Sequence, residues 1–162
     1  MYKRQGVRSS VVRLPPTVHG DGDDGFVPTL ITIARQRGRS GYVGAGTNRW
    51  AAVHRVDAAR VFRLALEDAP AGSVWHAVGD EGVPTRALAE VFGRHLDLPV
   101  ASIPPEQAAK HFGWLGMFFA TDIAASSALT RERLGWAPTQ PGLVEDLDAG
   151  HYFDSSKLGI PV

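Results

Sequence analysis

The sequence predicts an α/β fold, with parallel strands that alternate with helices and a mostly helical C-terminal part. Short apolar segments of strand character alternate with amphipathic segments of helical spacing. The first strand, at residues 8–14, is apolar on both faces, which is typical of strands inside parallel sheets. From residue 106 onward the spacing is mainly helical. These three observations together favour the α/β class.

The first third of the chain predicts one strand, one loop and one helix. The strand at residues 8–14 ends at Pro15-Pro16, because proline cannot donate to a strand ladder. Residues 19–25 are rich in glycine and aspartate, a loop composition. Apolar side chains then recur at helical spacing over residues 26–37, and Gly38 ends this helix.

The remaining elements follow the same reasoning. A strand over residues 50–56 leads to a helix over residues 58–66, and Asp57 is placed to act as its N-cap. No repeat or linker interrupts the chain, so residues 1–162 are expected to form a single domain with a frayed tail at 154–162. Strands are further expected over residues 74–78 and 99–103, and helices over 85–95, 106–112, 114–121, 131–134 and 143–153.

Composition excludes several classes of protein. Seventeen basic and seventeen acidic residues cancel, so no charge excess favours nucleic acid or an anionic membrane as a partner. The absence of cysteine excludes disulfides, thiolate zinc sites and cysteine nucleophiles. The basic N-terminus lacks the apolar segment of a signal peptide, and no apolar run approaches the ~20 residues of a membrane span. We therefore expect a soluble, cytoplasmic protein.

One segment has the spacing of a dinucleotide-binding loop. Residues 38–44 read GRSGYVG, a G-x-x-G-x-x-G pattern. Such a loop needs an incoming strand and an outgoing helix, whose N-terminus faces the pyrophosphate. Here the predicted helix precedes Gly38, and a turn sequence follows Gly44. The pattern is interpreted as a capped helix followed by a glycine-rich turn.

Other polar and aromatic residues have structural explanations. Asp21, Asp23 and Asp24 lack the glycine and glutamate spacing of a calcium loop, and the histidines are scattered, so no metal site is expected. Trp136, before Pro138, is expected to be a packing anchor. Three further tryptophans are expected in the core, because no basic stripe accompanies them: Trp50, Trp75 and Trp114.

Three segments together resemble a known family. VVRLPPTVHGDGDDGFVPTLI, YVGAGTNRWAAVHRVDAARVFRLALE and TRERLGWAPTQPGL are similar to the C-terminal half of extended short-chain dehydrogenases/reductases, the NAD(P)-dependent epimerase/dehydratase-like proteins. The resemblance covers about residues 7–153. It implies a partial Rossmann-like sheet followed by a helical substrate-binding part.

The resemblance also shows a departure from the family pattern. The family's cofactor loop and its Tyr-x-x-x-Lys pair precede the Pro-Pro strand, and this sequence begins after both. No catalytic residue is therefore assigned. The chain alone is expected neither to hold the cofactor tightly nor to turn over a substrate, and a separate N-terminal half or another copy of the chain is a possible partner.

The resemblance implies roles for five residues. Pro15, Pro16 and Val18 fall where such proteins pass backbone along the nicotinamide ring of NAD or NADP, although the end of a strand explains them equally well. His19 falls where a tyrosine often faces the substrate, and a solvated loop histidine is the slightly favoured alternative. Arg49 matches an arginine that clamps the diphosphate of a nucleotide sugar, whereas an arginine at a turn is more often solvated.

Two functions remain open at this point. The chain is either the substrate-side portion of an NAD(P)-dependent oxidoreductase, epimerase or dehydratase, or a non-catalytic ligand-binding or interaction module that reuses the scaffold. A small molecule is the expected ligand in both cases.

Overall fold

The strands pair mostly in parallel, as the sequence predicts. The computed structural model describes residues 7–154. Three parallel pairs and one antiparallel pair form its sheets. The parallel pairs are β1 (Val11–Arg13) with β5 (Val74–His76), β2 (Thr17–His19) with β4 (Arg49–His54), and β3 (Ser40–Val43) with β7 (Val100–Ile103); β6 (Asp80–Pro84) is antiparallel to β4. The α/β prediction is confirmed.

Helices cover the strands and dominate the C-terminal part. The longest three alternate with strands, and the later ones are short. The predicted helices over residues 106–112 and 143–153 are each divided into an α-helix and a 3-10 turn. The helices are α1 (Phe26–Arg37), α2 (Arg55–Glu67), α3 (Thr85–Leu96), α4 (Ala108–Phe112), α5 (Leu115–Phe119), α6 (Ala128–Leu134) and α7 (Leu143–Asp148), with 3-10 turns η1 (Pro105–Gln107) and η2 (His151–Phe153).

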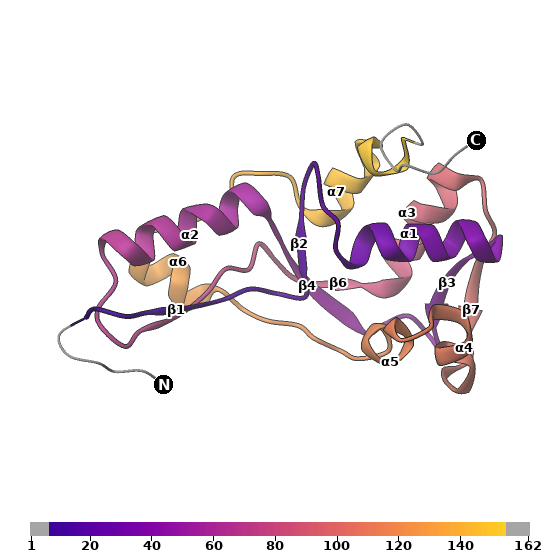
Figure 1. Cartoon of the computed structure of the whole chain (residues 1–162), viewed down its shortest axis with the longest axis horizontal. Coiled ribbons are helices and arrows are strands. Elements are labelled where there is room, and N and C mark those ends of the chain that lie inside the picture. The colour runs from indigo at the N-terminus through magenta and orange to yellow at the C-terminus, as the bar shows by residue number, and fades with distance from the viewer. Residues whose placement is uncertain (1–6, 155–162) are drawn as a thin grey trace.

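Two apolar cores lie at opposite ends of an elongated molecule. Figure 1 shows α2, α6 and β1 at one end, where β5 pairs with β1, and α1, α3, α4, β3 and β7 at the other. Strand β4 connects the two cores because its side chains pack into both of them. Trp50 and Ala52 are buried in the larger core beneath α1, whereas Val53 is buried in the smaller core beneath α2. Because successive side chains of a strand point to opposite faces, this one strand contributes to both cores.

Three strands were missed in the sequence, each for a local reason. β2 follows Pro15-Pro16, which ends β1 as predicted but does not prevent extended backbone from resuming. β3 is hidden inside the glycine pattern. β6 is half polar and contains Gly82, so its strand character comes from pairing with β4 rather than from its own composition.

The glycine pattern of residues 38–44 lies between a helix and a strand. Helix α1 enters Gly38, whose left-handed φ of 62° forms the C-cap, and Gly41 lies within β3. No outgoing helix follows Gly44; the chain instead turns into β4. The interpretation as a capped helix is confirmed, although a strand rather than a turn occupies most of the segment.

The predicted N-cap of α2 is wrong by one turn. The N-cap is His54, whose Nδ1 accepts a hydrogen bond from the Val56 amide at 3.3 Å. Asp57 lies inside the first turn, and its carboxylate instead accepts the amides of Thr139 and Gln140 at 2.9–3.1 Å. The long-range contact therefore outweighs the local capping rule.

Three of the four tryptophans lie where the sequence predicts. Trp50, Trp75 and Trp136 are buried, and the Trp136 indole donates a hydrogen bond to the carbonyl of Asp57. Trp114 is the exception, because its side chain is 71% exposed on the turn before α5. The apolar pattern around it does not distinguish a core position from a surface one.

Further expectations concern membranes, metals and the tail. No helix in the described part of the chain combines the length and apolar character that crossing a membrane requires. Among residues 7–154, no group of three or more metal-ligating side chains comes together. Of the predicted frayed tail, residues 155–162 lie outside the described residues.

His111 on α4 predicts a loss of stability under mildly acidic conditions. Burial, together with Arg37 and Arg39, lowers the pKa of the His111 imidazole below its usual value. The unfolded chain then binds a proton at His111 more readily than the folded chain, so stability falls as pH drops below about 6.5. We expect His111→Gln to weaken this pH dependence in urea unfolding measured at pH 7.5 and pH 5.5. Gln107→Ala, an exposed non-titrating neighbour, should keep the wild-type slope; an unchanged slope in His111→Gln would refute the assignment.

Candidate functional site

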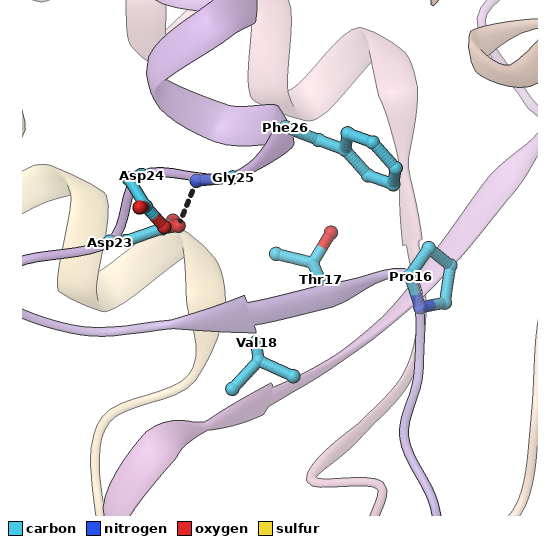
Figure 2. Close-up of a pocket in the computed structure, with 7 residues that line it drawn as sticks. All are labelled: Pro16, Thr17, Val18, Asp23, Asp24, Gly25 and Phe26. Carbon is cyan, nitrogen blue, oxygen red and sulfur yellow. Dashed lines mark hydrogen bonds between the residues drawn. The ribbon is translucent and has the colours of Figure 1, made fainter.

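A cavity lies where the beginning of β2 meets the beginning of α1. It has a volume of about 270 Å³. Figure 2 shows the strand backbone on one side and the first turn of α1 with its preceding loop on the other. The cavity is lined by Pro16, Thr17, Val18, Asp23, Asp24, Gly25 and Phe26.

Thr17 places an unused polar group at this cavity. Its side chain is 3% exposed, and its hydroxyl finds no hydrogen-bond partner among the described residues. In Figure 2 this hydroxyl leaves β2 toward the first turn of α1. Buried hydroxyls are nearly always hydrogen-bonded in native proteins, so this hydroxyl is expected to pair with a group outside the described residues, a water or a polar atom of a ligand.

Pro16 and Val18 both line the cavity, and Val18 does so mainly through its backbone. Figure 2 shows the Val18 side chain on the opposite face of β2 from Thr17, as the pleat requires. It packs against the smaller core. Strand β2 is at the edge of its sheet, paired only with β4 among the described strands. Pro15 is buried and is not one of the lining residues.

Asp23 closes the loop side of the cavity. One carboxylate oxygen accepts the Gly25 amide at 2.7 Å, and the other accepts the Tyr152 hydroxyl at 3.0 Å. Burial raises the pKa of the Asp23 carboxyl above its usual value, and burial likewise raises the pKa of Tyr152. The Tyr152 oxygen also accepts the Gly20 amide at 2.9 Å. The loop is thus fixed to the C-terminal turn η2.

His19 is buried, so the expectation of a solvated loop histidine is wrong. It is 1% exposed at the end of β2, and its Nδ1 lies 2.8 Å from an Asp146 carboxylate oxygen on α7. Its Nε2 has no partner among the described residues. His19 lines a second, smaller cavity of about 100 Å³ together with His54 and Asp80. The composition of the loop gave no signal that β2 extends through His19.

Arg49 begins β4 and is paired with Asp122. Its Nε lies 3.1 Å and its Nη2 2.9 Å from the two carboxylate oxygens, and the Arg49 amide donates to the same carboxylate at 2.6 Å. This pairing raises the pKa of Arg49 and lowers that of Asp122. Arg49 is half exposed and lies outside the lining of both cavities. It fastens residues 122–123 to the start of β4.

Two curated fungal proteins are similar to this chain. The chain is 52% identical over 152 residues to uncharacterized protein C2A9.02 of Schizosaccharomyces pombe, and 53% identical over 150 residues to uncharacterized protein YLL056C of Saccharomyces cerevisiae. The matches cover 94% and 93% of this chain but 52% and 50% of the relatives. The chain therefore spans about half the length of these relatives. No protein-family profile matches it.

Solved structures share the fold at low sequence identity. A dTDP-glucose 4,6-dehydratase from Streptomyces venezuelae with NAD and TYD bound has a TM-score of 0.66 at 19% identity, covering 90% of this chain and 43% of that one. A UDP-glucose 4-epimerase from Thermotoga maritima with UDP-glucose has a TM-score of 0.62 at 21% identity, covering 92% and 46%. The chain has part of an extended short-chain dehydrogenase/reductase fold. RMD from Pseudomonas aeruginosa, complexed with NADPH, matches with a TM-score of 0.61 at 18% identity, covering 91% and 48%.

The structure brings together only some of the residues assigned from the sequence. Pro16 and Val18 meet at one cavity, whereas His19 and Arg49 lie elsewhere. Thr17 and Phe26 were missed as site residues. Thr17 stands between two assigned positions, but nothing in the sequence shows that its hydroxyl is left without a partner. Phe26 was assigned only to the apolar face of a helix.

Proposed function

We propose that this chain is the substrate-side portion of an NAD(P)-dependent oxidoreductase, epimerase or dehydratase of the extended short-chain dehydrogenase/reductase type. The observation that carries the proposal is the cavity of Pro16, Thr17 and Val18 against the first turn of α1, with the buried Thr17 hydroxyl unpaired among the described residues. The chain shares its fold with proteins that were solved with NAD or NADPH bound, and this supports the same proposed function.

The cavity fits the nicotinamide end of the cofactor. Pro16 offers an apolar wall without an amide hydrogen, the edge of β2 offers backbone polar groups, and the Thr17 hydroxyl can pair with an amide of the ligand. A bound nicotinamide would supply or accept a hydride. The chain's own residues would orient the ring and exclude water from one of its faces.

The described residues do not fit the pyrophosphate end. Residues 38–44 lie between a helix and a strand, so they present no helix N-terminus to a phosphate. Asp23 and Asp24 at the cavity add negative charge. We therefore propose that residues outside this chain bind the pyrophosphate, and that this chain binds only the ring end, weakly.

The test is a nuclear magnetic resonance titration of the purified chain. Reduced nicotinamide mononucleotide should shift the backbone amides of Thr17, Val18 and Phe26, with a dissociation constant in the millimolar range, whereas ADP-ribose should shift none of them. Thr17→Val should weaken the binding. Thr32→Val is the matched control, because the Thr32 hydroxyl already donates to the Pro28 carbonyl.

Two outcomes would contradict the proposal. Micromolar binding of NAD or NADP that ADP-ribose displaces would show that this chain holds the pyrophosphate itself. A complete lack of nicotinamide-dependent shifts at Thr17 and Val18 would favour the non-catalytic module instead.

A further inference from the structure

The substrate that this cavity accepts can be narrowed by its charge and its aromatic surroundings. Solved neighbours include proteins with UDP-glucose and UDP-glucuronic acid bound. We infer that this chain selects an uncharged carbonyl or hydroxyl compound with an aromatic or alicyclic ring, and not a nucleoside diphosphate sugar. The inference rests on the proposed function and concerns the same cavity.

The first argument is that the arginine expected to hold a diphosphate already pairs with a carboxylate. One edge of the Arg49 guanidinium, formed by Nε and Nη2, contacts the Asp122 carboxylate at 3.1 and 2.9 Å, in the two-point geometry that a phosphate would also use. The Arg49 amide adds a third bond to the same carboxylate. A diphosphate would have to displace a partner of equal geometry that is fixed to β4 by the backbone.

The second argument is the charge of the cavity wall. Its seven lining residues, all in the described part of the chain, include Asp23 and Asp24 and no basic side chain. The Gly25 amide, which precedes the first turn of α1, already donates to Asp23. Two carboxylates so placed repel a diphosphate and leave the helix start without a free attraction for it.

The third argument is an aromatic surface that continues from the cavity. The Phe26 ring lines the cavity and lies 5.9 Å from the Trp114 ring and 5.8 Å from the Phe118 ring, between centroids. Trp114 is 71% exposed, and Met117 and Phe118 are also exposed. Exposed apolar side chains grouped in this way mark a binding surface, and aromatic rings favour a ring-bearing ligand.

Together these features define a binding mode. The ring of the substrate would lie against Phe26 and extend toward Trp114, beside the nicotinamide, and its carbonyl or hydroxyl oxygen would share the Thr17 hydroxyl with the amide of the cofactor. Sharing is chemically allowed because a hydroxyl has one donor and two acceptor sites: it can accept from the cofactor amide and also donate to a carbonyl or accept from an alcohol of the substrate.

The test uses 1-indanone and 1-indanol as ring-bearing probes, and UDP and UDP-glucose as diphosphate probes. In the same resonance titration, both indane compounds should shift the Thr17 and Phe26 amides and the Trp114 indole, and the diphosphates should shift none. Trp114→Ala should weaken indanone binding by about three- to tenfold. Leu129→Ala, at another largely exposed apolar residue on the distant α6, should leave binding unchanged.

The failures of the two proposals can be told apart. Binding of UDP-glucose at the same amides, lost in Arg49→Ala, would overturn the inference while the nicotinamide titration still supports the function. Indanone binding without any nicotinamide effect would refute the proposed function alone. Trp114 shifts that depend on protein concentration and vanish on dilution would assign the aromatic surface to a second copy of the chain and overturn its role here.

Discussion

Replacing Asp57 by alanine should destabilise the folded chain by about 2–4 kcal/mol, because its buried carboxylate is the acceptor for two backbone amides. The Asp57 side chain is 1% exposed. Its carboxylate accepts the amides of Thr139 and Gln140 and the Thr139 hydroxyl, and it contacts the Arg60 guanidinium at 3.3 Å. Alanine would leave the Thr139 and Gln140 amides without their acceptor, and such orphaned groups carry the cost of desolvation, whereas Arg60 keeps the Ala137 carbonyl and the Thr139 hydroxyl as acceptors.

The consequence reaches beyond α2. Asp57 anchors the segment that follows α6. In this segment the Trp136 indole donates to the Asp57 carbonyl and packs into the smaller core. Urea unfolding followed by circular dichroism measures the loss. Asp57→Asn keeps one acceptor oxygen and should cost less than alanine. The control is Asp68→Ala, at the exposed end of α2, which should change stability by no more than about 0.5 kcal/mol. A cost below 1 kcal/mol for Asp57→Ala would contradict this account.

The fold class could be predicted because it depends on patterns that are local. Helical spacing identified α1, α2 and α3, and apolar strands identified β4, β5 and β7. β6 could not be found in this way, because its strand conformation comes from pairing with β4, which lies far away in the sequence. Asp57 failed for the same reason. A capping rule considers neighbouring amides, whereas its actual partners are 82 and 83 residues away.

The candidate site was predictable only in outline. Pro16 and Val18 were assigned through the family resemblance and do line the cavity. The properties that give the cavity its chemistry are relations between distant residues, however: an unpaired hydroxyl at Thr17, an arginine neutralised by Asp122, and an aromatic ring of Phe26 beside Trp114. None of these relations can be read from a single segment.

Replacing Trp50 by alanine should destabilise the folded chain by about 3–5 kcal/mol, as expected for a large buried aromatic side chain. Trp50 is fully buried on β4. Its ring lies 5.3 Å from Phe119 in an edge-to-face arrangement and 5.7 Å from Phe26, between centroids. Alanine would leave a cavity beneath α1 and α5. The surrounding side chains are closely packed and can fill this cavity only in part.

Two further variants separate packing from other effects. The Trp50 indole nitrogen has no hydrogen-bond partner among the described residues, so Trp50→Phe removes volume without orphaning an acceptor and should cost only about 1–2 kcal/mol. Trp114→Ala removes the same side chain from an exposed position and should change stability by about 0.5 kcal/mol or less. Urea unfolding midpoints measure the stability of all three variants, and equal costs for Trp50→Ala and Trp114→Ala would contradict the burial argument.

The Trp50 ring also packs against the Phe26 ring, at 5.7 Å between centroids. Trp50→Ala should therefore weaken indanone binding even under conditions in which the chain remains folded.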